Sequence, residues 1–174
     1  ETVIVFHDGF RLLRWGGWFR RAGMRNVMLD THQYLIAMED SLFSGPARRL
    51  YLRSRRLPWL YRMLVGASGI AIRSAARRIP VLVGEWCVEN QWALHSQNRS
   101  AAYRQVSRLQ RAAWDVSAGQ IYWSYQLARS AKPGSGEGKP PRDPRNGGNL
   151  EAWDLTRVWR HGWIRADTSH DDVP

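Results

Sequence analysis

A carboxylate that follows a buried strand is the most reactive candidate in the sequence. Glu85 comes after the apolar run Val81 to Val83, with Gly84 between them and Trp86 behind. A glycine at such a point allows close approach of neighbouring backbone. We therefore expect the Glu85 carboxylate in a cleft beside an aromatic ring, where it could have a functional role. The alternative is an ordinary surface carboxylate in a loop.

A histidine and a tyrosine form the second candidate pair. His32 and Tyr34 are two residues apart, and alternate residues of an extended segment point the same way. Asp30 is in the same register. The alternative is a structural histidine. No second His stands at a ligand spacing and Cys87 has no partner, so we expect neither a metal nor another cofactor.

Two further strand ends carry candidate binding residues. Trp123 follows another apolar run and could stack on a sugar ring or belong to the core. Asp8 and Phe10 share a face by the same alternation, although Asp8 could equally cap a helix. The chain has ten tryptophans, which suit sugar stacking but would also suit stacking on nucleic-acid bases.

Four short apolar runs precede these polar residues. They lack the alternation of half-exposed strands, so they predict strands buried on both faces, as in parallel sheets. The runs lie at 3–6, 26–29, 80–83 and 119–123.

Helical patterns separate the runs. They cover 12–21, 47–78 and 100–117, and breaks near Pro58 and Gly66 divide the second into two expected helices. Alternating strands and helices predict an α/β fold built from parallel units. In a (β/α)8 barrel, the reactive residues lie at the carboxyl ends of the strands, where the polar motifs stand.

The C-terminal part has a different composition. Residues 130–149 are rich in Gly and Pro, which predicts a long loop within one domain spanning 1–166. Asn149 is a candidate cap for a last short helix, and residues 167–174 read as a frayed tail. We interpret the tryptophans of this part as packing residues: Trp153, Trp159 and Trp163.

The charge is the main evidence for another class of protein. A net charge of +11 with scattered arginine pairs would suit a polyanion or nucleic-acid binder. Most of the pairs fall within expected helices, so we interpret them as solvated helix surfaces and do not expect a nucleic-acid partner. No apolar run is long enough to span a membrane, and we expect no membrane partner. The sequence does not indicate a compartment or an oligomeric state.

The motifs, taken in order, resemble glycoside hydrolase family 5. Val83-Gly84-Glu85-Trp86 resembles the strand-seven motif of that family, whose Glu is the catalytic nucleophile. Asp30-Thr31-His32-Gln33-Tyr34 is similar to its strand-six motif, whose His and Tyr lie near that nucleophile.

Three other segments extend the resemblance. The strand-eight segment, with its stacking Trp, is matched by Ile121 to Tyr125. The exo-β-1,3-glucanase-like branch has similar strand-five and closing segments, matched here by Val5 to Phe10 and Trp153 to Trp163. The resemblance implies strands five to eight of a (β/α)8 barrel, hence a partial barrel. The family's acid/base Glu lies at the end of strand four, upstream of these motifs, and is not Glu1.

The resemblance implies a retaining β-glycosidase that acts on an oligo- or polysaccharide. Glu85 would be the nucleophile, and the substrate-binding residues would be His32, Tyr34, Trp123, Asp8, Phe10 and Trp86. Tyr125-Gln126 stands where the glucanase branch often has Trp-Lys, so a β-glucan and a β-mannan both stay open. We expect the 174 residues alone to be inactive. The alternatives are a basic polyanion-binding protein and a glycan-binding barrel without activity.

Overall fold

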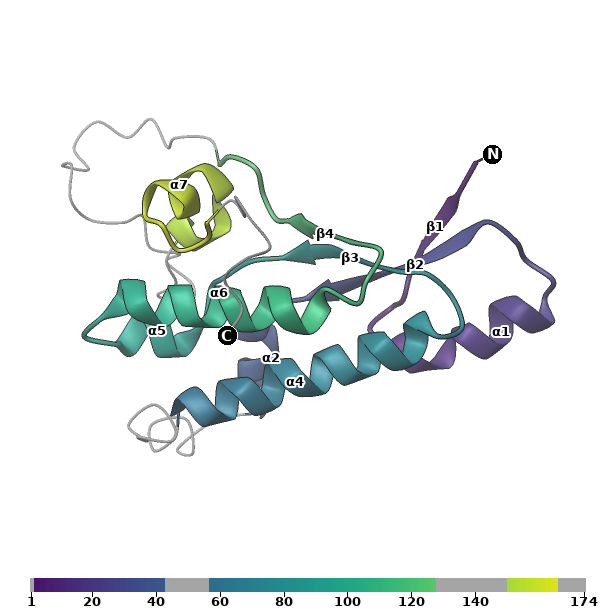
Figure 1. The fold of residues 1–174 in the computed structure, drawn as a ribbon, viewed down its shortest axis with the longest axis horizontal. Coiled ribbons are helices and arrows are strands. Elements are labelled where there is room, and N and C mark those ends of the chain that lie inside the picture. The colour runs from purple at the N-terminus through teal and green to yellow at the C-terminus, as the bar shows by residue number, and fades with distance from the viewer. Residues whose placement is uncertain (1, 43–56, 128–149, 166–174) are drawn as a thin grey trace, which may run out of the picture.

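The computed structural model describes residues 2–42, 57–127 and 150–165. Within these residues the chain forms one parallel sheet with the strand order β1-β2-β3-β4 (Figure 1). The strands are β1 (Ile4–His7), β2 (Val27–Gln33), β3 (Val81–Trp86) and β4 (Gly119–Tyr122). The α-helices are α1 (Gly16–Arg21), α2 (Leu35–Leu42), α4 (Leu57–Ala76), α5 (Gln91–His95), α6 (Arg99–Trp114) and α7 (Leu155–Arg160). Two short 3-10 helices complete the set: η1 (Leu12–Arg14) and η2 (Leu150–Trp153).

The predicted α/β class and the parallel sheet are confirmed. All four apolar runs form strands, but β2 and β3 continue past their apolar runs to Gln33 and Trp86. The polar motif residues Asp30, His32 and Glu85 therefore belong to the strands themselves. Pairing with neighbours holds them extended, and this pairing is not visible in a hydrophobicity pattern.

The predicted break near Gly66 is wrong, because helix α4 runs from Leu57 to Ala76 without interruption. The predicted break near Pro58 is not contradicted, since α4 begins at Leu57, one residue before this proline. Pro58 is the second residue of the helix, where the backbone N–H has no partner within the helix in any case. Gly66 lowers helix propensity by about 1 kcal/mol, but burial of Ile72 against the sheet and of Tyr61 against α2 and α6 stabilises the helix. The predicted residues 47–56 lie outside the described part of the chain.

The core lies between one face of the sheet and two helices. Helices α4 and α6 run side by side along this face (Figure 1). Leu29 of β2 and Val83 of β3 are buried in one cluster with Ile72 of α4 and Trp114 of α6. Helix α6 also buries Tyr103 and Val106. None of the described helices is long and apolar enough to cross a bilayer.

The other face of the sheet is open. Parallel register places Val5 of β1 beside Met28 of β2, and Val5 is 50% exposed. On β4, Ile121 is 51% exposed. Strands β1 and β4 each pair with one neighbour only among the described residues. The predicted burial of the strands on both faces is therefore wrong for the described residues. The sheet has one helix-covered face and one open face, and the edge strand β1 is exposed on both, since Ile4 is 53% exposed.

A carboxylate starts the last helix. The Asp154 side chain accepts a hydrogen bond from the backbone N–H of Arg157 at 3.1 Å. Burial raises the pKa of Asp154, but hydrogen bonds from Thr156 and from the backbone N–H groups of Leu127 and Arg157 outweigh it and leave the pKa lowered. Asp154 is therefore the cap of α7. The predicted cap Asn149, the rest of the predicted loop and the predicted tail lie outside the described residues.

Candidate functional site

A β-bulge turns the Glu85 side chain toward the open face. Simple alternation from Val81 and Val83 would place Glu85 with them on the helix-covered face. The register between β2 and β3 shifts after the Thr31–Val83 pair, and His32 then pairs with Glu85. Gly84 is the additional residue of the bulge. Glu85 consequently faces the same side as His32.

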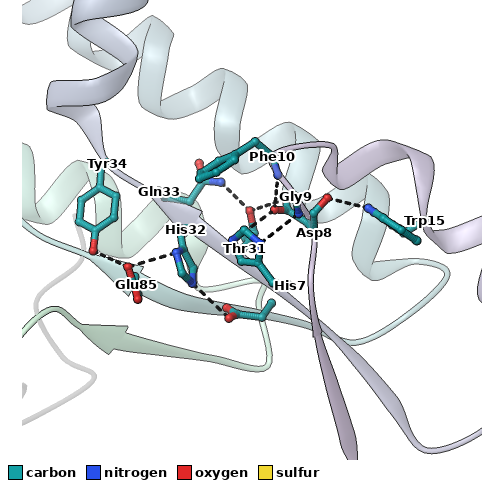
Figure 2. A network of polar contacts seen from close by, with 11 residues as sticks. His7, Asp8, Gly9, Phe10, Trp15, Thr31, His32, Gln33, Tyr34 and Glu85 are labelled. Carbon is teal, nitrogen blue, oxygen red and sulfur yellow. Dashed lines mark hydrogen bonds and ion pairs between the residues drawn. The ribbon is translucent and has the colours of Figure 1, made fainter.

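One oxygen of Glu85 receives two neighbours. The Tyr34 hydroxyl donates a hydrogen bond of 2.7 Å to Glu85 Oε2, and His32 Nδ1 lies 3.1 Å from the same oxygen (Figure 2). The side chains of His32 and Glu85 are 21% and 24% exposed. The three predicted residues Glu85, His32 and Tyr34 therefore meet in one partly open site. Together with Asp30 they form what we call the Glu85 cluster.

Asp30 occupies the far side of the imidazole ring. Its Oδ2 lies 3.2 Å from His32 Nε2. Its Oδ1 is buried and has no hydrogen-bond partner among the described residues. A Cβ atom at Gly84 would lie 2.0 Å from this Oδ1. Gly84 is thus the residue that makes room for the Asp30 carboxylate.

Tyr34 keeps its proton. Burial, the hydrogen bond to Glu85 and the negative charge of Glu85 raise the pKa of Tyr34 well above its ordinary value. Its ring stacks on Trp153, with centroids 5.2 Å apart and an interplanar angle of 28°. Tyr34 is therefore held as a donor toward Glu85.

The cysteine of the chain lies away from solvent. Cys87 is buried, and burial raises the pKa of its thiol well above the ordinary value. A protonated thiol is a poor nucleophile and a poor metal ligand. Among the residues with a described position, no group of three or more His, Cys, Asp and Glu side chains could hold a metal ion.

The prediction that Asp8 and Phe10 share a face is corrected. Asp8 is 1% exposed, and its carboxylate accepts hydrogen bonds of 2.8 Å from the Thr31 hydroxyl and from the Phe10 backbone N–H. Phe10 is 77% exposed. Both Gly9 and Phe10 have positive φ angles, 58° and 59°, so the chain turns here and alternation does not apply. Asp8 holds the loop, and only Phe10 extends outward.

The predicted position of Trp86 beside the substrate is also corrected. Trp86 is 4% exposed and packs edge-on against Trp114 and Tyr122 in the core. Neighbouring strand residues point to opposite faces, so the bulge that exposes Glu85 buries Trp86. Trp123 directly follows β4 and is 49% exposed. Alternation along β4 places Trp123 on the open face with Ile121.

Sequence reasoning missed the role of one cluster member, Asp30, and two neighbours of the cluster. Asp30 was in register with His32, but no role was assigned to it. The His7 ring lies 4.3 Å from the His32 ring, and adjacency of β1 and β2 could have indicated this contact. Trp153, interpreted as a packing residue, instead stacks on Tyr34, and no sequence signal indicates that contact.

No protein-family model matches the chain, and no curated protein gives a significant match to it.

Proposed function

We propose that this chain contributes strands five to eight of a (β/α)8-barrel β-glycosidase that acts with retention, and that Glu85 is its nucleophile. The proposal keeps the resemblance to glycoside hydrolase family 5 and its exo-β-1,3-glucanase-like branch. The substrate is a β-linked oligo- or polysaccharide of the glucan or mannan type.

One observation carries the proposal. Glu85 lies at the carboxyl end of a parallel strand, and Tyr34 and His32 both contact its Oε2. Two neighbours on one oxygen orient the carboxylate and leave Oε1 as the oxygen that attacks. A hydrogen bond to an ionised acceptor is stronger than one between neutral groups, so the Tyr34 hydroxyl stabilises the anion.

The sheet supports a barrel over a doubly wound fold. Its strands follow one another in chain order without the reversal that characterises doubly wound sheets. The helices α4 and α6 pack on one face, whereas Val5 and Ile121 are half exposed on the other. In a barrel the open face becomes the packed interior, and both free edges pair.

The chemistry follows from the geometry of two carboxyl groups. Glu85 Oε1 forms a bond to the anomeric carbon while the bond from that carbon to the leaving oxygen breaks. A second carboxyl group, about 5–5.5 Å from the first in retaining enzymes, gives the leaving oxygen its proton. Water then cleaves the ester at the anomeric carbon, gives its proton to the second group and restores Glu85. In this proposal the second group belongs to a segment outside these 174 residues.

Exposed aromatic rings supply the binding surface. Trp123 and Phe10 are exposed, and both lie at the ends of strands that flank the Glu85 cluster. The apolar faces of sugar rings stack on such rings. Trp153 backs Tyr34 and so forms a wall of the same site.

A reagent that needs no acid catalyst tests the nucleophile directly. A β-glycoside with a dinitrophenolate leaving group and fluorine in place of its 2-hydroxyl transfers its sugar to the nucleophile, and the ester then hydrolyses slowly. Glucosyl and mannosyl versions would be incubated with the chain. We expect a mass increase of one fluorosugar, carried by the peptide that contains Glu85, and no increase in Glu85→Gln.

Glu151→Gln is the matched control. Glu151 is also 24% exposed, and its carboxylate also contacts a histidine, His161, at 3.3 Å. It should label as the native chain does. A label on another carboxylate, or an equal label on Glu85→Gln, contradicts the proposal. So does the lack of any label both on this chain and on a longer protein that includes the segment upstream of it.

The two alternatives give different results. A glycan-binding barrel without activity binds the sugar but forms no adduct with Glu85. A polyanion binder holds nucleic acid with an affinity that falls steeply with salt. Among the described residues, the exposed arginines of the two long helices include Arg62 and Arg73 on α4 and Arg108 on α6.

A further inference from the structure

We infer that His32 carries a proton on both ring nitrogens, and that Asp30 is a positioning residue that holds the second proton there. The inference concerns the row of three groups formed by Asp30, His32 and Glu85. Its consequence for catalysis rests on the proposed function, whereas the position of the proton does not.

His32 lies between two acceptor oxygens, and a neutral imidazole ring can donate to only one of them. Nδ1 of His32 lies 3.1 Å from Glu85 Oε2, and Nε2 lies 3.2 Å from Asp30 Oδ2. Carboxylate oxygens only accept hydrogen bonds, and a neutral imidazole has one N–H and one bare lone pair. With a neutral ring, a lone pair would face an anionic oxygen at about 3 Å. One extra proton shared by the three groups removes this repulsion.

The extra proton resides on the His32 ring and not on Glu85. Glu85 Oε2 already accepts the Tyr34 hydroxyl, which stays protonated because its pKa is raised. Asp30 Oδ1 is buried without a partner in the described residues, so the main compensation for the Asp30 charge is His32. An imidazolium between two carboxylates gives each anion a donor, whereas a protonated Glu85 would leave Asp30 facing a neutral ring.

The remaining neighbour adds no anion. His7 lies against the His32 ring with centroids 4.3 Å apart, and its Nε2 lies 3.9 Å from Asp8 Oδ1. Three charged or titratable groups therefore contact the His32 ring directly: Asp30, Glu85 and His7. Tyr34 acts on the ring only indirectly, through its hydrogen bond to Glu85.

Gly84 leaves the space that the Asp30 side chain needs in this position. The Asp30 carboxylate occupies the space that a side chain at Gly84 would need, with 2.0 Å between Oδ1 and an added Cβ. The same glycine is the extra residue of the bulge that brings Glu85 opposite His32. Gly84 thus positions the Asp30 carboxylate on one side of the His32 ring and the Glu85 carboxylate on the other.

The consequence is a nucleophile that stays ionised. Glu85 Oε2 would hold two donors, the Tyr34 hydroxyl and the His32 Nδ1–H, and the proton that could neutralise Glu85 is kept by the ring. Without the Asp30 charge, no anion would face Nε2 and hold the second proton there. A neutral ring could still donate Nδ1–H to Glu85, but Glu85 would lose the stronger, cationic donor.

Nitrogen NMR of histidine-labelled chain tests the inference near neutral pH. Signals from His32 are assigned by their loss in His32→Gln. We expect both ring nitrogens of His32 at imidazolium positions, and a neutral tautomer pair in Asp30→Asn. Ring-nitrogen signals of a neutral imidazole for His32 in the native chain overturn the inference. A folded variant is needed only to assign the His32 signals.

His161 is the internal control. It contacts a single carboxylate, Glu151, at 3.3 Å, so the hydrogen count demands no second proton. Its signals should not change in Asp30→Asn, which also verifies that the variant is folded. Unchanged imidazolium signals of His32 in a folded Asp30→Asn variant would show that Asp30 does not hold the proton, and would overturn the role of Asp30.

Kinetics separate positioning from simple structural support. In Asp30→Asn we expect the rate of Glu85 labelling to fall about tenfold at neutral pH and its alkaline limb to move to lower pH. A structural role would lower the rate without moving the limb. The two proposals fail separately: an imidazolium signal without labelling contradicts the nucleophile, and labelling with a neutral His32 contradicts only the proton.

Discussion

Alternate residues of β2 build two polar networks on opposite faces of the sheet. On the helix-covered face, Thr31 receives a hydrogen bond from Gln33 and donates one to the buried Asp8. On the open face, His32 lies between the carboxylates of Asp30 and Glu85. The first network surrounds one anion with neutral donors and ties β1 to β2. The second brings two anions to one ring that is partly exposed.

The difference shows how one strand serves two purposes. Burial removes water, so the covered network must satisfy its anion with fixed donors, and it stabilises the fold. The open network keeps access to solvent at His32 and Glu85, whose side chains are 21% and 24% exposed. If this comparison is correct, substitutions in the first network should change stability, and those in the second should change chemistry.

The largest expected effect is on the open face. Glu85→Gln should lower glycosidase activity of the complete enzyme by about 10,000-fold or more, because an amide cannot form the glycosyl ester. The free energy of unfolding should change much less. Turnover of an aryl β-glycoside and urea denaturation measure the two quantities. Near-native turnover would remove the central residue of the proposal.

The next effect concerns the bulge that links the two faces. Gly84→Ala places a methyl group 2.0 Å from Asp30 Oδ1. Asp30 can give way only by rotating, which breaks its contact with His32. We expect a loss of about 2–3 kcal/mol in unfolding free energy, together with slower labelling of Glu85. Gly66→Ala is the control, since an added Cβ there meets nothing within 4 Å. Equal behaviour of the two variants would contradict this account of Gly84.

The covered network should affect stability alone. Asp8→Ala leaves the Thr31 hydroxyl and the Phe10 N–H without their acceptor, which should cost about 2–3 kcal/mol of unfolding free energy. The rate at which Glu85 is labelled, measured well below the denaturation midpoint, should stay native. A stable variant with slow labelling would reverse the assignment of the two networks.

A smaller effect is expected for the tyrosine on the open face. Tyr34→Phe removes one donor from Glu85 and keeps the stack on Trp153, so labelling should slow about tenfold with little loss of stability. The raised pKa of Tyr34 implies that its contribution is fully present below pH of about 10 and is lost only as the pH rises through the folded-state value. The ratio of native to variant rates should therefore be constant from neutral pH to about pH 10. A ratio that changes near neutral pH would contradict the assigned hydrogen bond.

The smallest effect is on sugar affinity. Trp123→Ala should weaken glycan binding about fivefold, the equivalent of about 1 kcal/mol for one lost stacking contact, without destabilising a half-exposed position. Trp159→Ala, at 47% exposure on α7, is the matched control and should bind as the native chain does. Isothermal titration calorimetry with β-linked gluco- and manno-oligosaccharides compares the dissociation constants of the two variants and the native chain. Equal losses would show that Trp123 has no specific role.

Local patterns were sufficient for much of the fold and for half of the site. Apolar runs without alternation predicted four parallel strands, and the spacing of Asp30, His32 and Tyr34 predicted a common side, because the period of a strand is two residues. The same rule failed at Asp8 and Phe10, where two positive φ angles turn the chain. The expectation that a glycine ends a helix failed at Gly66, where packing of α4 outweighs the low helix propensity of this residue.

The sequence by itself determined the parallel α/β class and the strand ends at which polar residues gather, since these depend on local composition and on the chemistry of neighbouring residues. Only the tertiary structure decided which face each carboxylate takes. The bulge at Gly84 depends on pairing between β2 and β3, which are separated by a long helix. The stack of Trp153 on Tyr34 joins the chain's C-terminal part to β2 in the same way. Such contacts arise from packing between distant segments, and no local pattern encodes them.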